Sequence, residues 1–246
     1  LLLIFCAGRW PGLGWRIMAG LLCLLCISQL VVYAKMPLPP EYAKKSITSV
    51  DLRFFKVKQY WLGAAMLFFY ISTEYAIVGW LVTYFQDIGV LDPNQSQMMN
   101  SLLWLVIFLG RMVGAVITGK LSRSKLLLLD GVGLFSFFLV MFFSRTPAPI
   151  ILGLVGVGFF MATIYPTAFA FGSDCIRGND LGCSVMIFTG SAGGILTPAM
   201  VGFVAERAGI RAGMGLIVVF AALLLFSILL SVFSVRTAQA LPEKGE

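Results

Sequence analysis

The chain of 246 residues contains no histidine. Nucleophiles activated by a Ser–His or Cys–His pair, histidine-ligated zinc and histidine-ligated haem are therefore impossible within it. Cys23 and Cys26 have a Cys-x-x-Cys spacing, but there is no second pair. These two thiols are better interpreted as apolar filler than as zinc ligands. No paired acidic motif is present either, so we expect no enzyme, no metal site and no bound cofactor.

Charge is also scarce, because only 12% of the residues are charged and 59% are hydrophobic. Soluble domains carry about 25% charged residues. A hydrocarbon core of about 30 Å is crossed by roughly 20 apolar residues of helix, and lipid offers no partner to an unpaired backbone group. The sequence therefore predicts an all-α membrane protein. Full spans are expected at 17–34, 60–85, 98–119, 126–143, 150–172, 184–205 and 212–235, after the end of another span at 1–8.

The longest polar interval runs from Lys35 to Lys58 and begins with three prolines within four residues, Pro37, Pro39 and Pro40. Such a segment cannot form a continuous helix, which makes it a natural boundary between two bundles. Because the chain begins at Leu1 without an initiator methionine, we expect the C-terminal part of a longer protein. The predicted division is the end of an N-terminal bundle at 1–34, a cytoplasmic linker at 35–58, a six-helix bundle at 59–236 and a cytoplasmic tail at 237–246.

The basic residues are distributed unevenly between the two alternating sets of joints. One set holds twelve lysines and arginines, including Lys44 and Lys125, and the other holds five. Cytoplasmic loops carry the excess of basic residues, so the first set and the C-terminus are predicted to face the cytoplasm from a plasma membrane or bacterial inner membrane. The net charge of +7 is then a topology signal, and we expect no nucleic-acid partner.

Glu74 lies near the middle of the expected span 60–85. A charged group at this depth costs several kcal/mol and normally faces a water-filled path or a partner. Tyr70, one helical turn before it, shares its face, and Trp80 follows in the same span. We predict that all three bind substrate. Three roles stay open for Glu74: a proton carrier, a hydrogen-bond acceptor for a hydroxylated solute, or a residue bonded only to a neighbouring helix.

On the expected span 98–119, Asn100, Trp104 and Arg111 lie at i, i+4 and i+11 and share one face. An aromatic ring flanked by polar groups suits a sugar, whose apolar face stacks while its hydroxyls hydrogen-bond. Alternatively, Asn100 and Trp104 anchor the helix at the outer interface, where tryptophan is enriched. Asp130 lies at a depth comparable to that of Arg111, and we expect these two to form a structural ion pair or gate latch.

Two later spans contain residues that interrupt helices. Tyr165-Pro166-Thr167 lies in one, and Gly193, Gly194 and Pro198 lie in the other. Proline removes a helix hydrogen bond and disfavours α geometry in the preceding residue. Interrupted helices near the midplane line the substrate site of alternating-access carriers. We predict that Tyr165 binds substrate and that Pro166 and these three residues of the second span have gating or structural roles, ordinary kinks being the alternative.

Several motifs resemble one family. Gly110-Arg111-Met112-Val113-Gly114 with Gly119-Lys120-Leu121-Ser122-Arg123-Ser124-Lys125 resembles the signature of the major facilitator superfamily between helices eight and nine, with Ser122 in place of its acidic residue. Trp10-Pro11-Gly12-Leu13-Gly14-Trp15-Arg16 is similar to the joint between helices five and six. Tyr165-Pro166-Thr167-Ala168-Phe169 and Gly193-Gly194-Ile195-Leu196-Thr197-Pro198 resemble the fucose and glucose/galactose permease branch.

The resemblance implies the six-helix C-terminal bundle of a twelve-helix fold, with the end of the N-terminal bundle before it. It also implies secondary transport of a small hydrophilic solute, most readily a sugar, by alternating access, with Arg123 in a gating or structural role. The expected partners are this solute, a proton or sodium ion, the lipid bilayer and the missing N-terminal bundle. A drug or amphiphile exporter and a non-transporting receptor or assembly protein on the same fold are the alternatives.

The predicted orientation can be tested by cysteine labelling of the full-length protein. A membrane-impermeant maleimide added from outside should modify Asp92→Cys but not Lys125→Cys, because the two positions lie in joints of opposite sides. Labelling at position 125 without labelling at position 92 would contradict the charge-based topology.

Overall fold

The structure is a computed structural model that describes residues 14–36, 52–176 and 179–240. The expected end of a span at 1–8, the linker residues 37–51 and the tail residues 241–246 lie outside this part. The chain divides into two compact units, residues 1–50 and residues 51–246, and each is described by itself.

The first unit contains α2 (Gly14–Lys35), a helix of 22 residues. Its bounds extend the expected span 17–34 by a few residues. The second unit begins with a short 3-10 helix, η1 (Arg53–Lys56), inside the expected linker. Its further elements are α3 (Lys58–Asp87), α4 (Pro93–Ile117), α5 (Arg123–Phe143), α6 (Pro147–Met161), α7 (Ile164–Ser173), η2 (Asp174–Ile176), α8 (Asp180–Ala208) and α9 (Ile210–Ala240).

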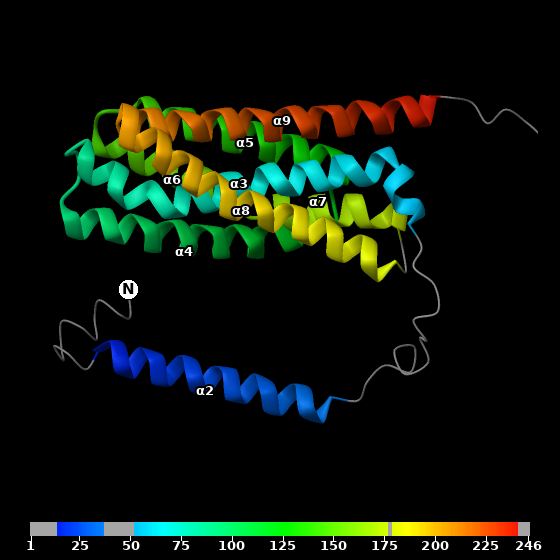
Figure 1. Cartoon of the computed structure of the whole chain (residues 1–246), viewed down its shortest axis with the longest axis horizontal. Helices are drawn as coiled ribbons and strands as arrows, with labels where there is room; N and C mark the ends of the chain where they lie inside the picture. Colours follow the sequence, from blue (N-terminus) through cyan, green and yellow to red (C-terminus); the bar gives the residue numbers. More distant parts are fainter. Residues whose placement is uncertain (1–13, 37–51, 177–178, 241–246) are drawn as a thin grey trace, which may run out of the picture. The chain divides into compact units, whose positions relative to one another are not determined.

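Within the described residues, seven helical segments are long and apolar enough to cross a membrane, α6 to η2 counting as one crossing. Six of them form the second unit, where they run alongside one another (Figure 1). α9 continues to Ala240, so residues 237–240 of the expected tail are helical. The prediction of an all-α membrane protein is confirmed.

α3 is the central helix of the second unit. It packs against α4, α7, α8 and α9, whereas α5 packs against α6 and α9, and α4 against α6. The apolar core includes the fully buried side chains of Leu67, Ile77 and Leu81 on α3. α3 also carries polar residues in its middle, which its neighbours cover. Ser72, Thr73 and Glu74 are all buried there.

The predicted span 150–172 is interrupted, as expected from Pro166, but the break lies before the proline. α6 ends at Met161 and α7 begins at Ile164, with Ala162 and Thr163 between them. The physical reason is that the proline ring lacks an N–H and clashes with the carbonyl four residues earlier, which is that of Ala162. Pro166 itself lies in the first turn of α7, where a missing N–H is tolerated.

The second expected interruption does not occur. α8 is one continuous helix from Asp180 to Ala208, with Pro198 inside it. Pro198 has no N–H, so the carbonyl that loses its helical partner is that of Gly194, four residues earlier. The Trp80 indole N–H donates to the carbonyl of Pro198 itself at 3.0 Å, which joins α3 to α8. Gly193 and Gly194 lie against α3 instead, facing Phe68, Ile71 and Ser72. Their structural role is close packing of the two helices.

Gly63 marks another close approach, between α3 and α7. A Cβ added at Gly63 would lie 2.6 Å from the Cα of Gly172 and 3.0 Å from its backbone nitrogen. Backbone atoms cannot move aside as the end of a side chain can. This contact therefore requires glycine at position 63.

Replacement of Gly63 by alanine should lower the free energy of unfolding by about 1–3 kcal/mol, because the methyl group overpacks the contact. Gly79→Ala is the matched control, since Gly79 lies in the same helix and has no atom within 4 Å of its added Cβ. It should be neutral or slightly stabilising. The melting temperatures of the two variants in detergent measure the difference; equal values would contradict the close approach.

Candidate functional site

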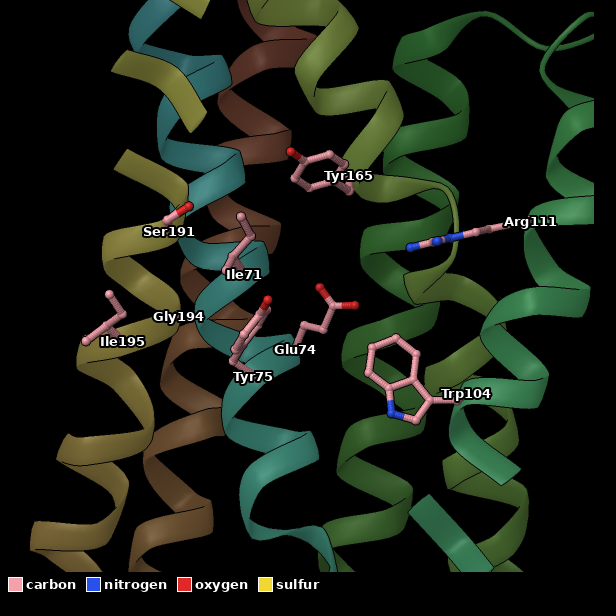
Figure 2. Close-up of a pocket in the computed structure, with 9 residues that line it drawn as sticks. All are labelled: Ile71, Glu74, Tyr75, Trp104, Arg111, Tyr165, Ser191, Gly194 and Ile195. Carbon is pink, nitrogen blue, oxygen red and sulfur yellow. The ribbon is translucent and has the colours of Figure 1, made fainter. Parts of the chain in front are cut away.

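A cavity of about 470 Å³ opens between α3, α4, α7 and α8. This volume lies within the range of small-molecule sites, about 300–1,000 Å³. Figure 2 shows the side chains that surround it. The lining residues are Ile71, Glu74, Tyr75, Trp104, Arg111, Tyr165, Ser191, Gly194 and Ile195.

Helical periodicity explains how the lining is assembled. α3 contributes Ile71, Glu74 and Tyr75, which lie at i, i+3 and i+4, and the same spacing recurs in α8 at positions 191, 194 and 195. Residues so spaced share one helix face. α4 contributes Trp104 and Arg111, two turns apart. α7 contributes only its second residue, which follows the α6–α7 break.

Glu74 and Arg111 give the cavity one group of each charge. The Glu74 side chain is buried with 8% of its surface exposed, and its carboxylate points into the same space as the Arg111 guanidinium (Figure 2). No ion pair joins them within the residues that the structure describes. The two groups interact electrostatically across the cavity that both of them line.

Tyr70 lies behind this site and does not line it. Its side chain is fully buried, and its ring packs at 6.1 Å from that of Tyr165. The hydroxyl lies close enough to Glu74 for an electrostatic interaction but makes no hydrogen bond of normal geometry. Tyr70 thus supports the wall from which Tyr165 and Glu74 project.

Two of the predicted binding residues lie elsewhere. Trp80 packs over Gly202 and donates its hydrogen bond to Pro198 on α8. It is six residues after Glu74, which places it about 120° around the helix from the carboxylate. Asn100 is not among the lining residues either, and its amide oxygen is buried without a hydrogen-bond partner in the described residues. Neither residue contacts the cavity.

The expected ion pair between Arg111 and Asp130 is not formed, which corrects that prediction. Asp130 is buried, with 5% of its surface exposed, and accepts a hydrogen bond from the Thr163 hydroxyl. Arg111 instead lines the cavity opposite Glu74. Similar depth in two consecutive helices is not enough for contact, because α4 and α5 do not pack closely against each other and α6 packs against both.

Arg123 is the member of the signature loop that forms an ion pair. Its guanidinium binds the carboxylate of Asp174, so the N-terminus of α5 is joined to η2 at the end of α7. The acidic residue that the signature has at position 122 is absent, but the loop is held by this other pair. The gating or structural role of Arg123 stays a prediction, with which this ion pair is compatible.

Four lining residues were not predicted: Ile71, Tyr75, Ser191 and Ile195. Ile71 and Tyr75 could have been predicted from helical periodicity. Ile71, Glu74 and Tyr75 lie at i, i+3 and i+4 and therefore share one face of α3. The glycines of α8 could have indicated Ser191 and Ile195, since these flank Gly193 and Gly194 in the sequence. Small or apolar residues in a lipid-spanning helix carry no distinguishing signal of their own.

No family model matches the chain. Two curated proteins from Helicobacter pylori, of strains ATCC 700392 / 26695 and J99 / ATCC 700824, are named "Putative glucose/galactose transporter". They are 28% and 27% identical to this chain over 199 residues, which cover 80% of this chain and 47% of each relative. The chain thus spans about half the length of the curated relatives it matches.

Among solved structures, the chain is similar to the crystal structure of FucP, a major facilitator superfamily transporter, in the outward conformation. The TM-score is 0.68 at 19% identity, covering 89% of this chain and 54% of FucP. The predicted fold is therefore confirmed: the chain has the fold of a major facilitator superfamily transporter over about half of that fold. The resemblance to its sugar-permease branch is confirmed by the two curated relatives.

The two tryptophans of this region should respond differently to truncation. Trp80→Ala should lower the free energy of unfolding by about 3 kcal/mol, because it removes packing over Gly202 and the hydrogen bond to Pro198. Trp104→Ala should cost less than about 1 kcal/mol, since 47% of the Trp104 side chain is exposed. Thermal unfolding of both variants of the full-length protein compares them; a larger loss at Trp104 would show that its ring is part of the packed core.

Proposed function

We propose that this chain forms the C-terminal half of a secondary transporter that carries a small hydrophilic solute, most readily a hexose, by alternating access. The observation that carries the proposal is the cavity lined by Glu74, Arg111, Trp104 and Tyr165. The name that both curated relatives carry, "Putative glucose/galactose transporter", supports the solute class.

The lining suits a sugar for chemical reasons. A hexose has an apolar face that stacks on aromatic rings, and the rings of Trp104, Tyr75 and Tyr165 surround the cavity (Figure 2). Its hydroxyls both donate and accept hydrogen bonds. The Glu74 carboxylate accepts and the Arg111 guanidinium donates, so both kinds of partner are available on opposite walls.

The balance of charge argues against the alternative of an exporter for cationic amphiphiles. A single carboxylate in an aromatic pocket would suit a cation, but Arg111 lines the same cavity as Glu74. A bound cation would meet repulsion from the guanidinium at short range in a medium of reduced dielectric constant. A neutral polyhydroxylated solute avoids this cost.

The rest of the transporter follows from the same proposal. The second wall of the site would come from the N-terminal bundle, and rocking of the two bundles would expose the site to either side of the membrane. A proton or a sodium ion would drive accumulation. The protein would reside in the plasma membrane or bacterial inner membrane with its C-terminus in the cytoplasm, as the excess of basic residues favours.

Substitution of Glu74 tests its role in the full-length protein reconstituted into proteoliposomes. If Glu74 accepts hydrogen bonds from the solute, Glu74→Gln should raise the half-saturating concentration of D-glucose or D-galactose on the order of tenfold, because a charge-assisted hydrogen bond contributes about 1.5–3 kcal/mol. Accumulation at saturating sugar under an imposed pH gradient should persist. Glu206→Gln, an exposed carboxylate near the end of α8, is the control and should match the wild type.

Three other outcomes would change the role of Glu74 or the proposed function. Loss of uphill accumulation with retained counterflow exchange would make Glu74 the proton carrier instead. Unchanged affinity together with unchanged accumulation would remove Glu74 from the site. Absence of saturable hexose exchange in the wild type would contradict the proposed function itself.

A further inference from the structure

Thr163 forms an unusual hydrogen bond at the break between α6 and α7. Its hydroxyl donates across the bundle to the carboxylate of Asp130 on α5. Threonine hydroxyls in helices commonly bond to the carbonyl four residues earlier. That pattern is followed here by Thr73, Thr118, Thr167 and Thr189.

Asp130 has no other role in the mechanism described so far. It is buried within α5, with 5% of its surface exposed. A carboxylate in such a place is costly and is normally retained for a function. The only side-chain partner that the structure describes for it is the Thr163 hydroxyl.

Thr163 is also held from its other side. A Cβ added at Gly114 of α4 would lie 2.1 Å from the Thr163 methyl group, so this methyl already rests on the glycine. One turn earlier, a Cβ at Gly110 would lie 2.8 Å from that of Ala162. Ala162 thus packs against Gly110 and Thr163 against Gly114, the two glycines on either side of Arg111 in α4.

Tyr165 follows Thr163 by two residues and lines the cavity. The backbone between them is tied to the break, since the Thr167 amide and hydroxyl both donate to the Thr163 carbonyl, at 3.2 and 2.7 Å. A shift of the Thr163 backbone would therefore carry the first turn of α7 with it. Tyr165 would move with this turn relative to the other residues that line the cavity.

We propose that Asp130 is a positioning residue for the solute site: by fixing Thr163 at the α6–α7 break, it sets the place of Tyr165 in the cavity without touching the solute. This inference rests on the proposed function, because it assigns Tyr165 a contact with the solute. The proposal gives the buried Asp130 carboxylate a role, although it forms no ion pair with Arg111.

A double-mutant cycle in the full-length transporter tests the proposal through solute affinity. Thr163→Val keeps the shape of the side chain and removes the donor, and it should raise the half-saturating concentration of D-galactose in counterflow on the order of tenfold. In a Tyr165→Ala background the same change should alter that concentration less than twofold, since the residue being positioned is gone. Thr163→Ser, which keeps the hydroxyl, should restore most of the affinity.

Ser231→Ala is the matched control, because it removes a buried hydroxyl on α9 that bonds only to its own helix, and it should leave the affinity unchanged. Equal effects of Thr163→Val with and without Tyr165 would overturn the proposal, as would an equal loss in Ser231→Ala.

A second measurement needs no transport, so it separates this inference from the proposed function. Tyr165→Cys is labelled with a hydrophilic thiol reagent in purified, monodisperse protein whose other cysteines are replaced. Adding Asp130→Asn, which keeps one acceptor oxygen, should change the labelling rate less than adding Asp130→Ala. Identical rates in all three proteins would overturn the positioning role, whereas a shifted rate without hexose exchange would refute only the proposed function.

Discussion

The structure depends on one constraint, which is that a bilayer core offers no hydrogen-bond partner to the chain. Continuous helices meet this constraint within themselves. Every departure from a plain apolar helix must be compensated by protein. The break at Ala162 and Thr163 is covered by the glycines of α4 and bonded to Asp130.

The same constraint concentrates the polar chemistry. Glu74 and Arg111, which lipid would not tolerate without compensation, face a shared cavity together with three aromatic rings. α3 can hold a carboxylate at its centre because four neighbouring helices pack around it. Glycines at the contacts with α7 and α8 allow these helices to approach closely. Close packing and the cavity therefore adjoin on α3, where Ile71 and Tyr75 lie against Gly194 of α8 and also line the cavity.

Much of this arrangement could be predicted from the sequence because its signals are local. Length and hydrophobicity indicated each span, Pro166 indicated a break, and the depth of Glu74 indicated the cavity. What could not be predicted depends on helix rotation and on partners far apart in the sequence. Trp80 turned toward Pro198, 118 positions away. Asp130 accepts a hydrogen bond from Thr163 at the α6–α7 break. Arg111 lines the cavity instead of pairing with Asp130.

We propose that the solute binds in the cavity between α3, α4, α7 and α8. Ser191 lines it from α8 without contributing a charge or a ring, so Ser191→Cys can report on occupancy in a full-length, otherwise cysteine-free protein. The most direct measurement is the rate at which a hydrophilic methanethiosulfonate modifies this cysteine, with saturating D-glucose or D-galactose and with mannitol as control. We expect slower modification with either hexose and no change with mannitol. Equal rates in the presence and absence of a hexose that the protein transports would contradict binding of the solute in this cavity.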